Sequence, residues 1–182
     1  LISKIPDKKR LADFPNYLIH RASKLKNLFI FKNTEATIEM IRSMNPNIIV
    51  NATGSNPLLP PIKGLHENID KEGGKVSSIT NMINHVMEYP EDLKGKKVVV
   101  IGAGLAGTEA ACDIAGKDGD VTLVEMCPDI LFTANHCLNN DQHLRKMVKD
   151  RGVKVEANMS NFLLSDMSGA KSKMGFGVSV GG

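Results

Sequence analysis

One glycine-rich stretch, Gly102–Gly107 (GAGLAG), limits the folds open to this chain more than any other feature. The hexad alone indicates little, because glycine is common. Here it follows an unbroken β-branched run, Lys97–Ile101, and leads into an Ala-rich segment, Leu105–Ala115, which Gly116 can terminate. The sequence therefore predicts a strand, a tight turn and a helix, which is the context that gives such a hexad meaning.

Each glycine of the hexad has an expected task. Gly102 supplies the tight turn, Gly104 lets the backbone approach a pyrophosphate, and Gly107 lets the helix pack close to the strand. We expect a Cβ at Gly104 to fill the space of the pyrophosphate and to strain the turn. The pyrophosphate would sit at the positive end of the helix, an interaction of roughly 0.3–2 kcal/mol. The alternative is a glycine turn needed only for packing.

An acidic residue, Glu125, ends the next predicted strand, Val121–Val124. A carboxylate at this point can accept hydrogen bonds from both ribose hydroxyls of an adenosine, although an exposed strand-end carboxylate is the alternative. The residues directly after Glu125 include no Arg or Lys, and Asp129 adds negative charge, so the sequence predicts NADH rather than NADPH. The cofactor-binding residues expected in this region are Gly102, Ala103, Gly104, Leu105, Ala106, Gly107, Glu125 and Met126.

The second half of the predicted unit repeats the alternation of strand and helix. Asn140–Arg151 is predicted as a helix with Gly152 just past its end, and Val153–Val155 begins a third strand. The order βαβαβ predicts an α/β fold, a Rossmann-like three-layer parallel sheet that binds NAD. Because Lys97–Ile101 shows no alternation of apolar and polar residues, we expect this strand to be covered on both faces.

The region before the glycine-rich unit predicts further helices and strands. A helix is expected from Asp13, with Asp13 as its cap and Pro15 in its first turn. Three more elements are expected: a strand at Leu28–Phe31, a helix at Glu39–Met44 and a buried strand at Asn47–Ala52.

The positions of proline and glycine residues suggest where the domains end. Pro60 and Pro61 follow the Thr53–Pro57 turn, so the chain is extended there. A helix over Asn81–Glu88 is expected to be capped by Ser78 or Thr80. The expected domains are residues 1–57, the C-terminal part of a preceding FAD-type domain; residues 58–168, an incomplete NAD(H)-binding domain with a possible strand at Phe162–Leu164; and residues 169–182, an irregular tail.

The overall composition excludes several classes of protein. Of 182 residues, 42% are hydrophobic and 24% charged, which is typical of a globular protein, and neither a membrane span nor a signal peptide is visible, so a cytoplasmic location is expected. Scattered lysines and 4% aromatic residues argue against nucleic acid as a partner.

The cysteines and methionines predict no separate chemistry. The three cysteines show no disulfide spacing, and His136 and Cys137 are adjacent in sequence, so a zinc site formed by them with Cys127 is not favoured and no metal site is expected. The predicted core methionines are Met82, Met87 and Met147.

Three stretches resemble a known family: NPNIIVNATGSNPLLPPIKG at Asn45–Gly64, LKGKKVVVIGAGLAGTEAA at Leu93–Ala111 and VTLVEMCPDIL at Val121–Leu131. Together they resemble the C-terminal region of Old Yellow Enzyme-like NADH:flavin oxidoreductases, such as 2-enoate reductase and 2,4-dienoyl-CoA reductase. The resemblance extends over roughly residues 10–155. It implies a portion of a flavin-dependent oxidoreductase that passes hydride from NADH to a flavin, in the parent enzyme toward reduction of an activated C=C bond.

The resemblance also assigns residues and cofactors. Ala52, Thr53 and Gly54 would line the boundary between the FAD and NAD(H) domains, and Glu109 would lie near the nicotinamide unless it is only a helix-surface residue. We expect the flavin and barrel domains, and with them FAD, FMN and an iron–sulfur cluster, only in the full-length parent. The chain itself is expected to be a fragment without catalytic residues of its own. The alternatives are a non-catalytic nucleotide-binding or redox-sensing module and a complete small FAD reductase.

Overall fold

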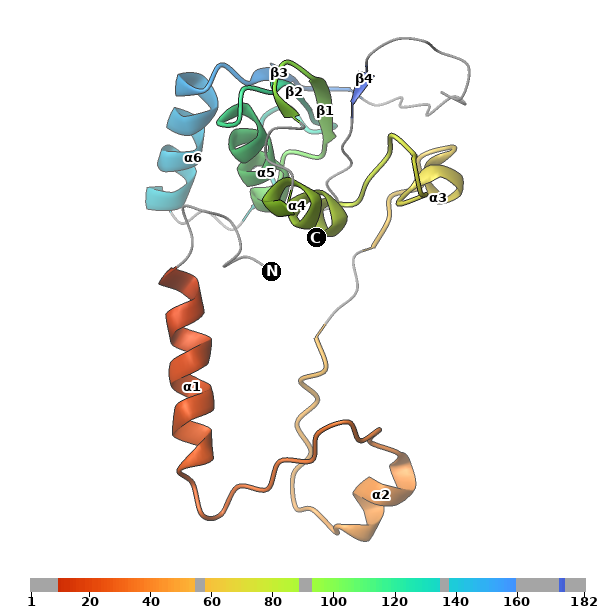
Figure 1. Ribbon diagram of the computed structural model, residues 1–182, viewed down its shortest axis with the longest axis vertical. Helices are drawn as coiled ribbons and strands as arrows, with labels where there is room; N and C mark the ends of the chain where they lie inside the picture. The colour runs from red at the N-terminus through yellow and green to blue at the C-terminus, as the bar shows by residue number, and fades with distance from the viewer. Residues whose placement is uncertain (1–9, 55–57, 89–92, 135–137, 160–173, 176–182) are drawn as a thin grey trace. The chain divides into compact units, whose positions relative to one another are not determined.

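The structure of the protein, a computed structural model, describes residues 10–54, 58–88, 93–134, 138–159 and 174–175 (Figure 1). The chain divides into two compact units. One unit is Lys9–Asn56, and the other holds Pro57–Gly182 together with Leu1–Lys8.

A parallel sheet of four strands, in the order β3-β2-β1-β4, organises the Pro57–Gly182 unit. Its strands are β1 (Lys97–Ile101), β2 (Asp120–Val124), β3 (Lys154–Glu156) and β4 (Met174–Gly175). All three strand pairs are parallel, and Val98 of β1 lies opposite Val121 of β2. The prediction of an α/β fold with a parallel sheet is therefore confirmed, and the first three strands lie within one residue of their predicted positions.

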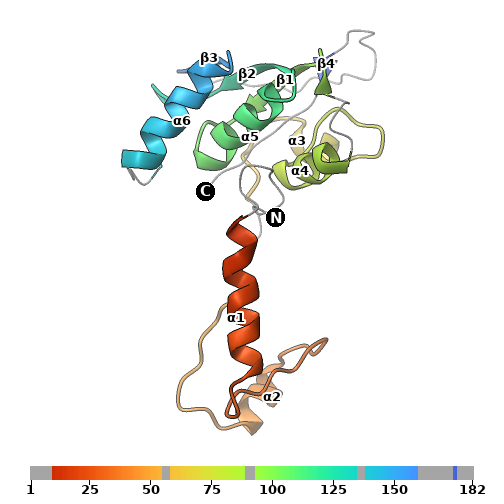
Figure 2. The same ribbon diagram turned by 60° about the vertical axis from the view of Figure 1, so that its left-hand side comes forward.

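Helix α5 (Leu105–Ala115) packs against β1 and β2, and α4 (Ile79–Glu88) and α6 (Leu138–Asp150) pack against α5 (Figure 2). Both flanking helices match predicted ones, and Ser78 caps α4 by accepting a hydrogen bond from the Asn81 N–H at 3.3 Å. A short helix, α3 (Leu65–Asn68), precedes α4. The order β1-α5-β2-α6-β3 is the predicted βαβαβ unit.

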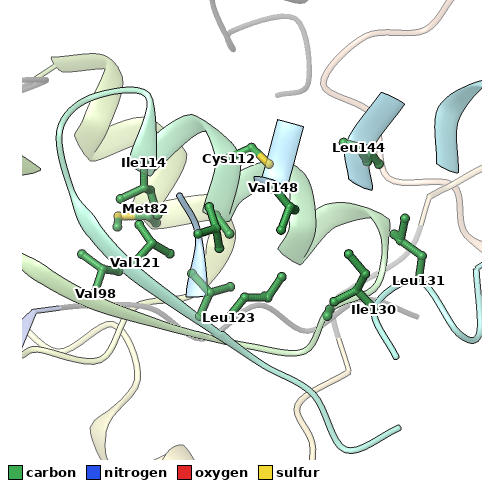
Figure 3. Packing of buried hydrophobic residues seen from close by; sticks show 14 of the residues in the cluster. Met82, Val98, Cys112, Ile114, Val121, Leu123, Ile130, Leu131, Leu144 and Val148 are labelled. Atoms are coloured by element: carbon green, nitrogen blue, oxygen red, sulfur yellow. The ribbon is translucent and has the colours of Figure 1, made fainter. Parts of the chain in front are cut away.

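The core of this unit lies between the sheet and the three longer helices, as Figure 3 shows for β1, β2, α5 and α6. Burying each Val, Leu or Ile side chain stabilises the fold by roughly 1.5–3 kcal/mol. Met82 is 4% exposed, as predicted, and Met147 packs against the cluster from α6, whereas the side chain of Met87 lies outside the described part. The buried cluster consists of Met82, Leu93, Val98, Val100, Ala103, Ala111, Cys112, Ile114, Val121, Leu123, Ile130, Leu131, Leu144, Val148 and Val153.

Two predictions about the sheet need correction. Strand β1 was expected to be covered on both faces, but Val98 and Val100 are buried while Val99 is 39% exposed. The described helices cover only the face of the strand that Val98 and Val100 share. The tail from Gly169 was expected to be irregular, yet Met174 and Gly175 pair in parallel with Lys97 and Val98. The predicted strand Phe162–Leu164 lies outside the described residues.

The Lys9–Asn56 unit contains two helices, α1 (Asp13–Ser23) and α2 (Ile38–Ser43). Both were predicted within one residue of their starts, and Pro15 does lie in the first turn of α1. Asp13, however, is the first helical residue rather than the cap: Ala12 holds the cap position, without a side-chain hydrogen bond. Thr37 caps α2 by accepting a hydrogen bond from the Met40 N–H at 3.2 Å.

The two strands predicted in this unit are wrong for the structure. Leu28–Phe31 and Asn47–Ala52 adopt no strand, and Ile48 and Val50 are each 81% exposed rather than buried. A β-branched run becomes a strand only when a neighbouring strand completes its hydrogen bonds, and the described residues 10–54 supply no such neighbour.

Within the described ranges, no helix combines the length and the apolar character needed to cross a lipid bilayer.

Candidate nucleotide-binding site

The turn between β1 and α5 begins at Gly102, which has a φ of 94°. Side chains other than hydrogen rarely tolerate this left-handed conformation, so the turn requires glycine here. The Gly102 N–H donates to the carbonyl of Val124 at 2.8 Å, which joins the turn to the end of β2. The turn therefore lies at the carboxyl end of two neighbouring parallel strands, where α/β proteins bind nucleotides.

Gly104 occupies the cap position of α5 and differs from Gly102. Its φ of −69° and ψ of −174° describe ordinary extended backbone, and no side chain caps the helix end. A Cβ placed on Gly104 would meet nothing within 4 Å. The expectation that a side chain here strains the turn is therefore wrong. A pyrophosphate bound at this uncapped helix N-terminus would occupy the open space, which a side chain would fill.

Ala103 lies between these two glycines and is 0% exposed, and hydrogen bonds to its backbone hold it in place. Its carbonyl accepts hydrogen bonds from the Thr108 hydroxyl at 3.1 Å and from the Leu131 N–H at 2.7 Å. Thr108 is itself fully buried in α5, next to the buried Gly107. The turn is thus fixed against both its own helix and the loop that follows β2.

Glu125 holds the same turn from the other side. Its carboxylate accepts hydrogen bonds from the N–H groups of Ala103 at 2.6 Å and Cys127 at 2.8 Å. Its backbone N–H donates to Glu156 at 2.8 Å, and its carbonyl accepts from Met159 at 3.0 Å. A carboxylate offers about four lone-pair sites, so each oxygen retains a site for a further donor such as a ribose hydroxyl.

The loop after β2 carries a residue in an unusual conformation. Leu131 has a φ of 60° although it has a large side chain. This conformation costs roughly 1–2 kcal/mol, which the burial of its side chain, 1% exposed, and its hydrogen bond to Ala103 offset. The hydrogen bond from Leu131 to Ala103 thereby holds the loop close to the glycine-rich turn.

Arg145 of α6 ties down the same loop and was not identified from the sequence. Its guanidinium donates to Asp141 at 2.5 Å, to Asp129 at 2.9 Å and to the carbonyl of Ile130 at 2.8 Å. The hydrogen bond to Asp141 is the main reason that the pKa of Arg145 is raised above its usual value. The spacing of Asp141 and Arg145 on one helix face was visible in the sequence, but their contact with the loop after β2 was not.

The described cysteines are free thiols that favour the protonated form. Burial raises the pKa of Cys112 to about 11. The pKa of Cys127 is raised by desolvation and then by the negative charge of Glu125. His136 and Cys137, considered for zinc, lie outside the described residues, and the part of the chain that the structure describes contains no cluster of three or more His, Cys, Asp or Glu residues able to hold a metal ion.

The remaining predicted site residues fall in different places. Met126 follows Glu125 and is 69% exposed, and Glu109 lies half-buried on α5. Ala52, Thr53 and Gly54 belong to the other unit and are exposed; the N–H and hydroxyl of Thr53 donate to the side chain of Asn51. The structure therefore brings together the Gly102–Gly107 turn and Glu125, whereas Ala52–Gly54 belong to the other unit.

Sequence comparisons identify relatives of this arrangement. The chain is similar to an NADH oxidase from Thermoanaerobacter brockii, with 32% identity over 130 residues, which are 71% of this chain and 19% of the relative. It is also similar to a cinnamate reductase from Clostridium sporogenes, with 32% identity over 126 residues, 69% of this chain and 17% of the relative. The chain spans about a fifth of the length of these curated relatives.

Comparison with solved structures gives the same fold. A complex of 2-naphthoyl-CoA reductase with 2-naphthoyl-CoA matches 98% of this chain and 26% of that chain, with a TM-score of 0.68 and 25% identity. A NAD-dependent persulfide reductase from A. fulgidus matches 71% of this chain and 25% of that chain, with a TM-score of 0.51 and 24% identity.

The profile of one family matches residues 27–162, a stretch that includes the glycine-rich turn, Glu125 and the loop that Arg145 holds. The match covers well over half of the chain. The chain therefore belongs to the pyridine nucleotide-disulphide oxidoreductases, a family of NAD(H)-binding flavoprotein oxidoreductases.

Proposed function

We propose that this chain is the NAD(H)-binding portion of a larger flavin-dependent oxidoreductase. The observation that carries the proposal is the open space beside Gly104, at an uncapped helix N-terminus, next to the fixed carboxylate of Glu125. A dinucleotide needs these two features at the carboxyl edge of a parallel sheet: N–H groups for its pyrophosphate and an acceptor for its adenosine ribose.

The residues of the chain bind and orient. The first N–H groups of α5 would receive the pyrophosphate, and the two oxygens of Glu125 would accept the ribose hydroxyls with the lone pairs that Ala103 and Cys127 leave open. Glu109, on the second turn of α5, would lie toward the nicotinamide. NADH held there would supply the hydride and a flavin of the parent would accept it, so no side chain here would have to transfer a proton.

The final electron acceptor is proposed from the relatives. One is named a cinnamate reductase, and the solved structure with a TM-score of 0.68 is a 2-naphthoyl-CoA reductase. Both names support a parent enzyme that reduces an activated unsaturated acid or thioester. The sequence resemblance would place FMN and an iron–sulfur cluster in a barrel region of that parent, and FAD beside residues 1–57. The Ala52–Gly54 segment is exposed, and we assign no step to it.

A second candidate function is nucleotide binding without catalysis. It is favoured by the core of the Pro57–Gly182 unit, whose buried cluster includes Ala103 of the glycine-rich turn. A binding or sensing module needs only that unit, whereas a reductase needs a flavin from elsewhere. Rapid oxidation of NADH by the full-length parent, in step with reduction of its flavin, would exclude the second candidate.

Titration of the full 182-residue chain with NADH tests the proposal. The wild type should quench and shift the nicotinamide fluorescence in a saturable manner, and Gly104→Val should abolish this signal. Because a Cβ at Gly104 meets no atom within 4 Å, the variant should keep the circular dichroism spectrum of the wild type, and only the loss of a favourable N-cap residue should lower its melting temperature. Binding of NADH by Gly104→Val with unchanged affinity would refute the assigned site.

A further inference from the structure

Helix α6 carries a cation, Arg145, whose charge is neutralised by carboxylates of its own helix and of the loop after β2. Arg145 is 36% exposed, and two carboxylates bind it: Asp141, 17% exposed, and Asp129, 57% exposed. Its third hydrogen bond goes to the carbonyl of Ile130. All three guanidinium nitrogens are therefore engaged, and the group of three side chains has a net charge of −1.

A short chain of hydrogen bonds connects this group to the proposed nucleotide site. The Asp129 carboxylate also accepts the Ile130 N–H at 2.8 Å, and the next residue, Leu131, donates to Ala103 at 2.7 Å. Ala103 in turn donates to Glu125. Arg145 and Asp129 are thus linked, through the loop and the glycine-rich turn, to Glu125, the residue that would receive the adenosine ribose.

NADPH differs from NADH by one phosphate on that ribose, so charge near Glu125 decides between the two. With Asp129 in place, a 2′-phosphate would approach a loop that carries an exposed carboxylate, and the cation of α6 that contacts this loop is already bound. Asp141 is the more enclosed of the two partners and anchors Arg145 on its own helix. Asp129 is the partner whose removal would free the guanidinium toward solvent.

We propose that Arg145 is a masked cation and that Asp129, by binding it, is a specificity-determining residue that favours NADH over NADPH. The inference rests on the proposed function, because it requires the nucleotide to bind at the Gly102–Gly107 turn. It goes further because it assigns the discrimination between NADH and NADPH, beyond Glu125, to Asp129 in the loop after β2 and Arg145 on α6.

The test is a set of paired titrations of the full chain with NADH and NADPH. Asp129→Asn keeps the size of the side chain and an oxygen for the Ile130 N–H, but removes the charge that binds Arg145. The affinity for NADPH should rise about fivefold, which corresponds to ~1 kcal/mol, while the affinity for NADH should change by less than about twofold.

Two further variants separate the mechanism from a general charge effect. Asp150→Asn removes the same charge from an exposed ion pair with Lys146 on the same helix and should leave both affinities unchanged. In the double variant Asp129→Asn/Arg145→Met, the gain for NADPH should disappear, because no cation is released. Raising the salt concentration from about 50 mM to about 500 mM should also reduce the gain in Asp129→Asn, since the freed charge is screened.

The outcomes distinguish this inference from the proposed function. If the wild type binds neither nucleotide, the proposed function fails and the inference fails with it. If the wild type binds NADH but the affinity for NADPH rises no more in Asp129→Asn than in Asp150→Asn, only the inference is overturned. A gain that persists without Arg145 would likewise overturn the masked-cation mechanism, because loss of repulsion by Asp129 would then explain it alone. Melting temperatures of all variants verify that the differences arise in folded protein.

Discussion

The carboxylate of Glu125 accepts a hydrogen bond from the buried N–H of Ala103 at 2.6 Å, so the residue proposed to bind the ribose also holds the glycine-rich turn in place. The two tasks use different lone pairs of one side chain. Substitutions at Glu125 should therefore change both stability and nucleotide binding.

Glu125→Ala should lower the free energy of unfolding. The Ala103 N–H would stay buried without its acceptor, and an unsatisfied buried donor costs roughly 1–3 kcal/mol. Urea denaturation followed by circular dichroism measures the loss. Glu125→Gln keeps one acceptor oxygen and should lose less. Equal stability of the wild type and Glu125→Ala would show that the hydrogen bond is not formed in solution.

Gly102 and Gly104 should respond to the same substitution with different losses of stability. Gly102→Ala forces a side chain into a φ of 94° and should destabilise the fold by about 1–2 kcal/mol. Gly104→Ala meets no neighbour at ordinary dihedral angles, so it should cost less, at most about 1 kcal/mol for the loss of a favourable N-cap residue. Thermal melts of the two variants side by side check this contrast, and a melting temperature for Gly104→Ala as low as that of Gly102→Ala would contradict it.

The wild type should prefer NADH over NADPH by roughly ten- to a hundredfold. A 2′-phosphate would place an anion where Glu125 otherwise accepts a hydroxyl, and like charges about 4 Å apart at an effective dielectric near 20 repel by roughly 4 kcal/mol, of which screening leaves about half. Isothermal titration of both nucleotides gives the ratio. The assignment of Glu125 would be overturned by NADPH binding as tightly as NADH.

Stability should fall at high pH because of Cys112. Burial raises the pKa of this thiol from 9.0 to about 11, so the unfolded chain ionises first as the pH rises. The stabilising difference is fully present below pH 9.0 and is lost between there and about 11, since the unfolded state then binds fewer protons than the folded one. Urea midpoints across this range should fall more steeply for the wild type than for Cys112→Ala. Parallel curves would contradict the raised pKa.

The sequence predicted those features whose signals are local. The strand Lys97–Ile101, the turn at Gly102 and the helix Leu105–Ala115 each follow from residues that are neighbours in the chain, and the structure contains all three. Patterns that depend on distant partners were misjudged. The apolar run at Asn47–Ala52 suits a strand, but the described residues of its own unit provide no strand beside it.

The part of the candidate site that sequence reasoning missed is likewise non-local. Arg145 reaches Asp129 across 16 positions of sequence, and no short motif relates them. Met174 and Gly175 pair with β1 from a segment whose composition indicated only a tail, because backbone hydrogen bonding in a sheet depends little on side chains. Glu125 was identified as an acceptor, but its bond to Ala103 could only be seen once β1 and β2 were placed side by side.

The double attachment of Ala103 also affects how fast a ligand can bind. Its N–H and carbonyl are both bonded within the protein, to Glu125 on one side and to Leu131 and Thr108 on the other, so the turn already has its final shape. A ligand that meets such a rigid receptor need not wait for a rearrangement. In stopped-flow mixing, the fluorescence of NADH should change in a single phase whose rate rises linearly with concentration. A rate that levels off would mean that a rearrangement of the protein or of the complex limits binding.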